Sequence, residues 1–272
     1  MSDYAIGIFD SGLGGLTAVK QLTQLLPNEN IVYFGDTARV PYGTRSRSTI
    51  IRYAEQDATF LLSKGVKLII AACGTVSSVA TGLKDELPVP FTGVVLPTAA
   101  AAVRATRNGR IGVIGTSATV NSGSYKTAII RQSPDITVYQ QECPLFVALV
   151  ENGFISEKDD IVKLTVERYL APLKQQKIDT LILGCTHFPI ISRAISDYLG
   201  ENVTLIDSGR ETALYAAELL KKQGLLSKSN EQGKCRYYVS DTVEDFRRTA
   251  EIFLGRNVGK EVSHINLEKA IV

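Results

Sequence analysis

Two of the four cysteines stand where a thiol can work as an acid or a base. Cys73 follows the apolar run 66–72 (VKLIIAA), and Cys185 follows the run 180–183 (TLIL) through Gly184. Both runs have the continuous apolar character of buried parallel strands, and small or polar residues follow each of them. A cysteine directly after a strand and at the start of a helix is in a position that lowers the pKa of its thiol from about 8.5. The spacing therefore predicts two reactive thiols.

Two such thiols on opposite sides of one carbon atom suit the inversion of a chiral centre. One thiolate would remove a proton from the carbon, and the other thiol would deliver a proton to the opposite face. A carboxylate near one sulfur and an imidazole near the other would assist these transfers, and Asp10 and His187 are the candidates. On position alone, this chemistry is one option among several.

Other chemistries find less support in the sequence. Cys143 precedes Pro144 and an apolar run, and Cys235 begins a predicted strand, so both are expected to be packing residues. With no CxxC pair and only two histidines, neither a thiolate zinc site nor a disulfide scaffold is expected. The segment 12–15 (GLGG) lacks the third glycine of a dinucleotide-binding fingerprint, and neither a P-loop nor a GxSxG motif occurs.

Strand-like and helix-like segments alternate along the chain. Strands are predicted over 5–9, 31–34, 66–72, 111–114, 180–183 and 236–240, and helices over 16–22, 211–222 and 242–254. This pattern is typical of an α/β protein with mainly parallel sheets. Ligands bind such sheets beyond the carboxyl ends of the strands. That edge would carry residues 10–11, 36, 73–75, 116–117 and 185–187.

Landmarks recur in the same order in the two halves of the chain. Residues 6–8 (IGI) correspond to 111–113 (IGV) 105 positions later, and Val32 corresponds to Val138 after 106. Cys73 corresponds to Cys185 after 112 positions. This repetition predicts two similar, pseudo-symmetric α/β domains whose active site lies in the cleft between them. From the Pro-rich stretch before residue 98 and the turn near 207, the first domain is expected to comprise 1–97 plus 208–272, and the second 98–207.

Composition places the chain among ordinary globular proteins. Of 272 residues, 44% are hydrophobic and 21% charged, and the formal net charge is +2. This charge is too small to hold nucleic acid or an anionic membrane by its field alone. No apolar stretch reaches the roughly 18 residues that cross a bilayer, and the N-terminus does not resemble a signal peptide. The expectation is a soluble, cytoplasmic protein with reduced thiols.

Four groups of motifs together resemble the glutamate racemases. They are residues 9–15 (FDSGLGG), 33–36 (YFGD) leading to 41–43 (PYG), 144–146 (PLF) leading to 150–153 (VENG), and 184–189 (GCTHFP). The resemblance covers nearly the whole chain, and the motifs are specific in combination. This family is a cofactor-independent branch of the amino-acid racemases, and it interconverts L- and D-glutamate to supply D-glutamate for bacterial peptidoglycan.

The resemblance implies roles for individual residues. Cys73 would act as the base on D-glutamate and Cys185 as the base on L-glutamate, with Asp10 and His187 in support and Glu151 near His187. The family's substrate-contact positions correspond here to Asp10, Ser11, Tyr42, Gly43, Gly74, Thr75, Thr186 and His187. The resemblance further implies no pyridoxal phosphate, no metal, a homodimer, and neither a nucleic acid nor a membrane as partner.

One residue departs from the family pattern. Gly74 stands where the family usually has asparagine, so only the backbone can contact the substrate there. The sequence alone gives the expectation that Gly74→Asn keeps activity within about tenfold, equivalent to roughly 1.4 kcal/mol, or improves substrate affinity.

Two alternatives remain open at this point. The chain could be a racemase of aspartate or another acidic amino acid, which Gly74 makes conceivable, although the match over 33–43 favours glutamate. It could also be a binding or regulatory protein that keeps the fold without turnover. Some glutamate racemases are reported to act on DNA gyrase, but no basic surface in this sequence predicts that. The presence of both cysteines, Asp10 and His187 argues against a silent homologue.

Overall fold

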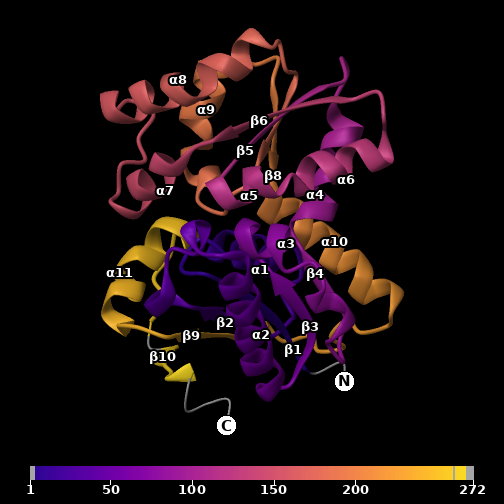
Figure 1. Cartoon of the computed structure of the whole chain (residues 1–272). Coiled ribbons are helices and arrows are strands. Elements are labelled where there is room, and N and C mark those ends of the chain that lie inside the picture. Colours follow the sequence, from indigo (N-terminus) through magenta and orange to yellow (C-terminus); the bar gives the residue numbers. More distant parts are fainter. Residues whose placement is uncertain (1–3, 260, 268–272) are drawn as a thin grey trace.

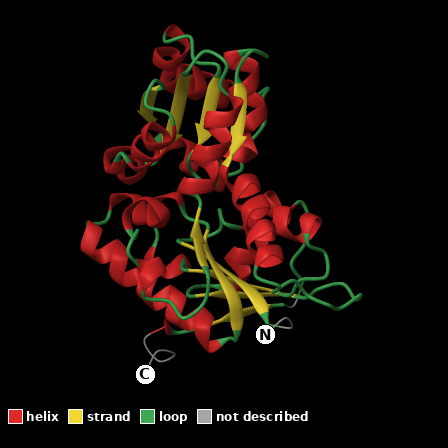
Figure 2. Ribbon diagram, turned by 90° about the vertical axis from the view of Figure 1, so that its right-hand side faces the viewer, coloured by secondary structure: helices red, strands yellow, loops and turns green. Residues whose placement is uncertain are grey.

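Two parallel β-sheets, each flanked by helices, form two lobes of the molecule (Figures 1 and 2). The structure is a computed structural model of the chain, and it describes residues 4–259 and 261–267. The first sheet has the strand order β10-β9-β2-β1-β3-β4, and the second has the order β6-β5-β7-β8. In Figure 1 both ends of the chain, indigo and yellow, lie in the lobe of the first sheet. Every strand pairing between the described residues is parallel, which confirms the predicted fold class.

The first unit is built around the six-stranded sheet. Its strands are β1 (Ala5–Asp10), β2 (Ile31–Gly35), β3 (Val66–Ala71), β4 (Phe91–Gly93), β9 (Cys235–Val239) and β10 (Val262–His264). Its helices are α1 (Leu16–Leu25), α2 (Arg47–Ser63), α3 (Gly74–Val79) and α11 (Val243–Leu254), with short 3₁₀ turns at Thr37–Arg39, Tyr42–Thr44 and Leu83–Asp85.

The second unit is built around the four-stranded sheet. Its strands are β5 (Arg110–Gly115), β6 (Thr137–Glu142), β7 (Thr180–Leu183) and β8 (Thr204–Asp207). Around them lie α4 (Val95–Ala105), α5 (Ser117–Ser122), α6 (Ser124–Gln132), α7 (Pro144–Glu151), α8 (Asp160–Gln175), the 3₁₀ turn Phe188–Ile191, α9 (Ser192–Leu199) and α10 (Ser208–Lys222).

The two units share one strand order. The order β2-β1-β3-β4 in the first sheet matches β6-β5-β7-β8 in the second, so β1 corresponds to β5 and β3 to β7. Cys73 follows β3 and Cys185 follows β7, which places the two thiols at equivalent strand ends. The predicted pair of similar, pseudo-symmetric α/β domains is therefore confirmed.

Buried apolar strands explain why the sheets form where the sequence predicts them. All residues of β1, β3 and β7 are buried, because helices cover both faces of each sheet (Figure 2). Helix α1 packs through Leu16, Val19 and Leu22, whose spacing puts them on one helical face.

Helix α10 joins the two units. It packs on α1 of the first unit and on α4 of the second. Asp207 caps it by accepting hydrogen bonds from the N–H groups of Gly209 and Arg210, so the helix begins at Ser208 rather than at the predicted residue 211. Helix α4 spans position 97, where the sequence suggests a domain boundary. One apolar cluster contains buried residues of both units, among them Leu16 and Phe188, so the two sheets lie over a common core.

The edge of the first sheet contains a strand that the sequence does not reveal. Strand β10 pairs in parallel with β9, within a segment that reads as a polar tail. Three residues (VSH) are too few for a recognisable strand pattern. Among the described residues, no helix has both the length and the apolar character needed to cross a membrane.

Candidate active site

A cavity of about 350 Å³ lies where the carboxyl ends of the two sheets face each other. It is lined by Ser11, Gly12, Val40, Pro41, Tyr42, Gly43, Thr44, Cys73, Gly74, Thr75, Thr116, Ser117, Pro144, Val147, Ala148, Glu151, Gly184, Cys185, Thr186 and His187. All the predicted site residues except Asp10 are in this set. The fold therefore brings together in one cavity groups that lie more than 100 positions apart in the sequence.

Cys73 lies at the end of β3 and directly precedes α3. Its thiol donates a hydrogen bond to the Ser11 hydroxyl at 3.5 Å. Burial raises the pKa of the Cys73 thiol to about 12, and the nearby charge of Asp10 adds to the increase. The prediction that a helix N-terminus lowers this pKa is therefore wrong, because the loss of hydration outweighs the hydrogen bonds to the thiolate.

Asp10 lies at the end of β1 but does not line the cavity. Its side chain is 1% exposed, and Oδ1 accepts a hydrogen bond from the N–H of Gly12 at 2.9 Å. Oδ2 has no hydrogen-bond partner among the described residues. Burial raises the pKa of the Asp10 carboxyl, and the proximity of His187 opposes that increase. The Asp10 carboxyl therefore lies behind the cavity wall rather than on it, and its charge contributes to the raised pKa of Cys73.

Cys185, His187 and Glu151 form a chain of polar contacts on the opposite wall. The Cys185 sulfur lies 3.8 Å from Nδ1 of His187, and Nε2 of His187 lies 2.9 Å from Oε1 of Glu151. Burial lowers the pKa of His187, but hydrogen bonds to Cys185 and Glu151 outweigh it and raise the pKa to about 10. The imidazole is therefore a cation at neutral pH, and its positive charge lies beside the Cys185 sulfur.

The His187 ring also contacts helix α11 of the first unit. Phe253 of α11 packs edge-on against it, with 5.3 Å between the ring centroids. The sequence offered no signal for this contact, since Phe253 reads only as part of an amphipathic helix.

The raised pKa of His187 predicts a pH-dependent stability. A folded-state pKa of about 10 against an unfolded value of 6.5 means that the protonated form stabilises the fold. This contribution is complete below about pH 6.5 and is lost as the pH rises through about 10. We expect the urea midpoint of the wild type to fall relative to that of His187→Gln across this window. A constant difference between the two proteins from pH 6 to 10 would contradict a protonated imidazole.

Hydroxyl groups from both units line the cavity between the thiols. Thr75 and Thr116 approach each other to 3.0 Å between their oxygens, and Thr186 lies beside Cys185. Thr116 and Ser117 are site residues that the resemblance did not indicate. A signal was present, because they follow β5 in the same position that Asp10 and Ser11 occupy after β1.

Tyr42 and Gly43 form the part of the cavity rim that belongs to the first unit. The Tyr42 side chain is 1% exposed, and its hydroxyl contacts the carboxyls of Asp36 and Asp57. Burial and the charge of Asp57 raise the pKa of Tyr42, so it is a neutral phenol. A Cβ on Gly43 would lie 3.1 Å from Cβ of Thr116, so this turn packs directly against the second unit.

Two glycines allow the backbones of the two units to meet. A Cβ on Gly14 would lie 2.0 Å from the Thr186 hydroxyl, and one on Gly74 would lie 2.2 Å from the carbonyl oxygen of Gly184. Real Cβ atoms essentially never come so close to another atom, so neither position can carry a side chain without a shift. This geometry speaks against the expectation that asparagine at position 74 is readily accommodated.

We therefore expect Gly74→Ala to lower kcat/KM by about tenfold to a hundredfold, since a displacement of about 1 Å at a catalytic site can cost that much. The added Cβ would push α3, and Cys73 with it, away from Gly184. Gly82→Ala is the matched control, because Gly82 has helical backbone angles and open space where the Cβ would lie. Steady-state kinetics on both variants decide the point. Equal activities of Gly74→Ala and the wild type would show that the two units adjust without cost.

The described lining of the cavity offers an anion hydrogen-bond donors but neither a lysine nor an arginine. None of its described lining residues is a lysine or an arginine, so the available donors are hydroxyls, backbone N–H groups and the His187 imidazolium. Nor do the described residues contain a group of three or more His, Cys, Asp or Glu side chains that could hold a metal ion. Cys143 and Cys235 lie in the apolar core, as expected of packing residues.

Comparisons with known proteins agree on one family. The model of the Asp/Glu/hydantoin racemase family matches residues 13–216. A glutamate racemase of Geobacter metallireducens is 46% identical over 265 residues, which is 97% of each chain. The crystal structure of a Francisella tularensis glutamate racemase in complex with D-glutamate superposes with a TM-score of 0.91, at 39% identity over 99% of this chain and 100% of the other. A Thermus thermophilus glutamate racemase in complex with β-chloro-D-alanine gives a TM-score of 0.89, at 42% identity over 98% and 99% of the two chains.

Proposed function

The chain belongs to the Asp/Glu/hydantoin racemase family, and from this premise we propose that it is a glutamate racemase that inverts Cα with two thiols. The match to glutamate racemases along nearly the full length of both chains supports glutamate as the substrate.

A single observation carries the two-thiol mechanism. Cys73 and Cys185 stand at equivalent strand ends of two similar sheets and line one cavity of about 350 Å³. Because the sheets face each other, the two sulfurs approach a bound amino acid from the two units. A cavity of this size suits a single small dicarboxylate, which hydroxyls such as those of Thr75, Thr116 and Thr186 would hold by hydrogen bonds.

The reaction balances without a further reagent. With L-glutamate, the Cys185 thiolate takes the Cα proton, so an S–H bond forms, the C–H bond breaks and its electron pair remains on the substrate. The Cys73 thiol then delivers its proton to the opposite face, which leaves D-glutamate and a Cys73 thiolate. With D-glutamate the roles reverse. Since two thiols account for both transfers, the proposal needs neither pyridoxal phosphate nor a metal.

The electrostatics of the cavity residues favour one starting state. Burial and Asp10 keep Cys73 protonated, while the positive charge of His187 lies 3.8 Å from the Cys185 sulfur. This arrangement is the one that accepts L-glutamate. Asp10 would then assist Cys73 in the opposite direction by its charge, and Glu151 would hold His187 in place.

The wider role follows from the family resemblance. We place the enzyme in the cytoplasm of a bacterium, where it would supply D-glutamate for peptidoglycan and act as a homodimer. Neither nucleic acid nor a membrane is required as a partner.

Proton NMR in D2O tests the proposed function. Purified protein with reduced thiols is incubated with L-glutamate, without pyridoxal phosphate, and the chirality of the product is determined. We expect the α-proton signal to disappear and D-glutamate to accumulate.

L-aspartate in parallel separates the alternatives. Exchange with aspartate alone would keep the two-thiol mechanism and replace the substrate. No exchange with either amino acid, in protein shown to be folded, would overturn the proposed activity and favour a binding protein without turnover.

A further inference from the structure

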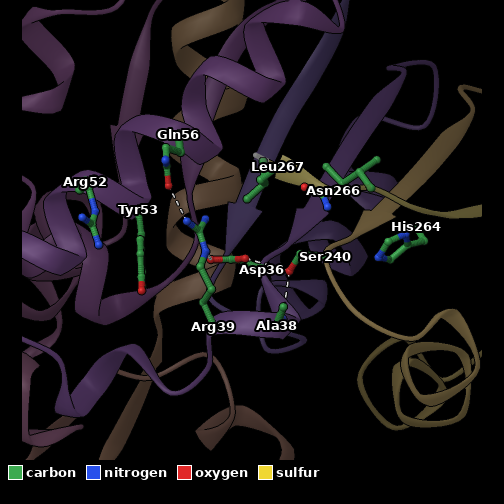
Figure 3. A pocket seen from close by; sticks show the side chains of 11 residues that line it. Asp36, Ala38, Arg39, Arg52, Tyr53, Gln56, Ser240, His264, Asn266 and Leu267 are labelled. Carbon is green, nitrogen blue, oxygen red and sulfur yellow. Dashed lines mark hydrogen bonds and ion pairs between the residues drawn. The ribbon is translucent and has the colours of Figure 1, made fainter. Parts of the chain in front are cut away.

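A buried polar cluster lies directly behind the Tyr42 rim of the cavity. Asp36 at the end of β2, Arg39 in the following turn and Asp57 on α2 all converge on the Tyr42 hydroxyl or on each other. Both carboxyl side chains are fully buried, and Arg39 is 20% exposed. Figure 3 shows Arg39 reaching toward Asp36 and Gln56 beside a second, outer cavity of about 470 Å³. Asp36, Arg39 and Asp57 do not line the cavity that contains the two thiols, and the proposed mechanism does not use them.

The contacts of Tyr42 require more protons than a phenol has. The Tyr42 oxygen contacts Oδ2 of Asp36, and it also lies 3.1 Å from Oδ2 of Asp57. A phenol has one proton, so it can donate to only one of two carboxylates. If both carboxyls were ionised, two buried negative charges would face one guanidinium, and one carboxylate oxygen would lie against the phenol oxygen without a proton between them.

We propose that Asp57 is a neutral carboxylic acid that donates its proton to Tyr42, and that this hydrogen bond positions the Tyr42–Gly43 rim of the substrate cavity. The chain of donors then runs from Asp57 to Tyr42 and from Tyr42 to the Asp36 carboxylate. Arg39 donates to Asp36 through Nε and to the Asp57 carbonyl oxygen through an NH2 group at 2.9 Å. Every polar contact in the cluster has a donor and an acceptor, and its net charge is zero.

The surroundings decide which of the two acids keeps the proton. Asp36 borders the outer cavity and accepts hydrogen bonds from Arg39, Tyr42 and the Ser240 hydroxyl, the last at 2.8 Å. Asp57 lines neither cavity, and among the described residues its carboxyl has only Arg39 and Tyr42 as hydrogen-bond partners. The anion is therefore better placed on Asp36, where more hydrogen-bond donors stabilise it.

The titratable groups that face Asp57 point to the same assignment. They are Asp36 after β2, Arg39 and Tyr42 in the two turns, and Asp10 at the end of β1. Burial raises the pKa of Asp57 well above its usual value, the charges of Asp36 and Asp10 add to this, and Arg39 and Tyr42 oppose it.

The consequence for the active site follows from the position of Tyr42. Its ring is buried under the turn whose next residue, Gly43, packs against Thr116 of the second unit. A fixed Tyr42 therefore holds the backbone of the rim where the substrate binds. This role rests on the proposed racemase function, whereas the location of the proton does not.

Three substitutions test the positioning role. Asp57→Asn keeps a donor toward Tyr42 and an acceptor toward Arg39, so we expect kcat/KM to stay within about threefold of the wild type. Asp57→Leu has a similar shape without either group, and Asp36→Asn removes the negative charge beside Arg39. We expect both to raise KM by about tenfold or more with a smaller change in kcat, because the rim binds the substrate and does not react.

The outcomes distinguish the two acids. If Asp57→Asn is as impaired as Asp57→Leu while Asp36→Asn is tolerated, the proton belongs on Asp36 and the assignment is overturned. If Asp57→Leu matches the wild type in KM, the cluster does not position the rim.

Two measurements locate the proton without any activity. An infrared difference spectrum between the wild type and Asp57→Asn at pH 7 should contain the carbonyl band of a protonated carboxylic acid. The urea midpoint of the wild type should also fall relative to that of Asp57→Asn as the pH rises above about 4, because a raised folded-state pKa stabilises the fold only while the acid is protonated. A carboxylate band, or a midpoint difference independent of pH, would overturn the proposal even if the protein proved to have another substrate.

Discussion

Replacing either cavity thiol, as Cys73→Ala or Cys185→Ala, is expected to lower racemisation by at least about 10³-fold while the protein remains folded. Each substitution removes the thiol that is proposed to exchange a proton with Cα on its side, and general acid–base groups contribute about 10²–10⁴-fold each. Both sulfurs line the cavity, and each side chain is small, so the loss of one sulfur atom leaves the sheets intact. Circular dichroism and the rate of D-glutamate formation are the measurements.

The control for this prediction is another buried cysteine. Cys235 lies in strand β9, away from the cavity, so Cys235→Ala should keep the wild-type rate. Turnover at the wild-type rate in either Cys73→Ala or Cys185→Ala would refute the two-thiol mechanism.

Isotope exchange distinguishes the two thiols. In D2O, Cys73→Ala retains Cys185, which can remove the proton of L-glutamate and return deuterium to the same face. This variant should therefore label L-glutamate without forming D-glutamate, and Cys185→Ala should label only D-glutamate. The reversed pattern would exchange the assignments of the two bases.

His187→Asn is expected to lower kcat/KM by about a hundredfold, which is within the range of one assisting acid–base group. The imidazolium lies 3.8 Å from the sulfur of Cys185, the thiol that is proposed to accept the proton of L-glutamate. Asparagine occupies a similar volume without a positive charge. The loss must be equal for L- and D-glutamate, because two enantiomers have the same free energy and the equilibrium constant is one.

Glu151→Gln is the graded comparison for His187. Glutamine can still accept the hydrogen bond from Nε2, and the Glu151 side chain is 42% exposed, so water screens the loss of its charge. We expect an effect of about tenfold or less on kcat/KM. If Glu151→Gln proved as impaired as His187→Asn, the carboxylate would be needed for its charge rather than as an orienting partner. A wild-type rate in His187→Asn would remove the imidazolium from the mechanism.

Much of the fold could be predicted because its strands are buried on both faces. Strands β1, β3 and β7 are continuous apolar runs that small or polar residues follow. Short runs of this kind in a globular protein are typical of strands in a buried parallel sheet. Strand β10 could not be predicted, since three residues with one buried side chain have no recognisable period. Its place depends on the neighbouring strand β9, which offers an open edge.

The sequence could predict which residues belong to the site, but it could not predict the pKa values of their side chains. Ten of the eleven site residues that the resemblance implies line the cavity. The resemblance did not indicate that Asp10 would lie outside the lining, and Thr116 was expected at this edge only from its place after a predicted strand. The pKa of Cys73 was expected to be low from its place at a helix N-terminus, and it is high because the first and second units together exclude water from the thiol.

The sequence by itself determined the family, the two equivalent strand ends and the thiols that they carry, because these depend on local patterns and motifs. The tertiary structure decided the contact of Phe253 with His187, the backbone approach of Gly74 to Gly184, and the pairing of Asp36 with Asp57. Each of these joins residues from separate elements. Hydration, charge and close packing act through space, so they depend on distances that the order of residues along a chain does not specify.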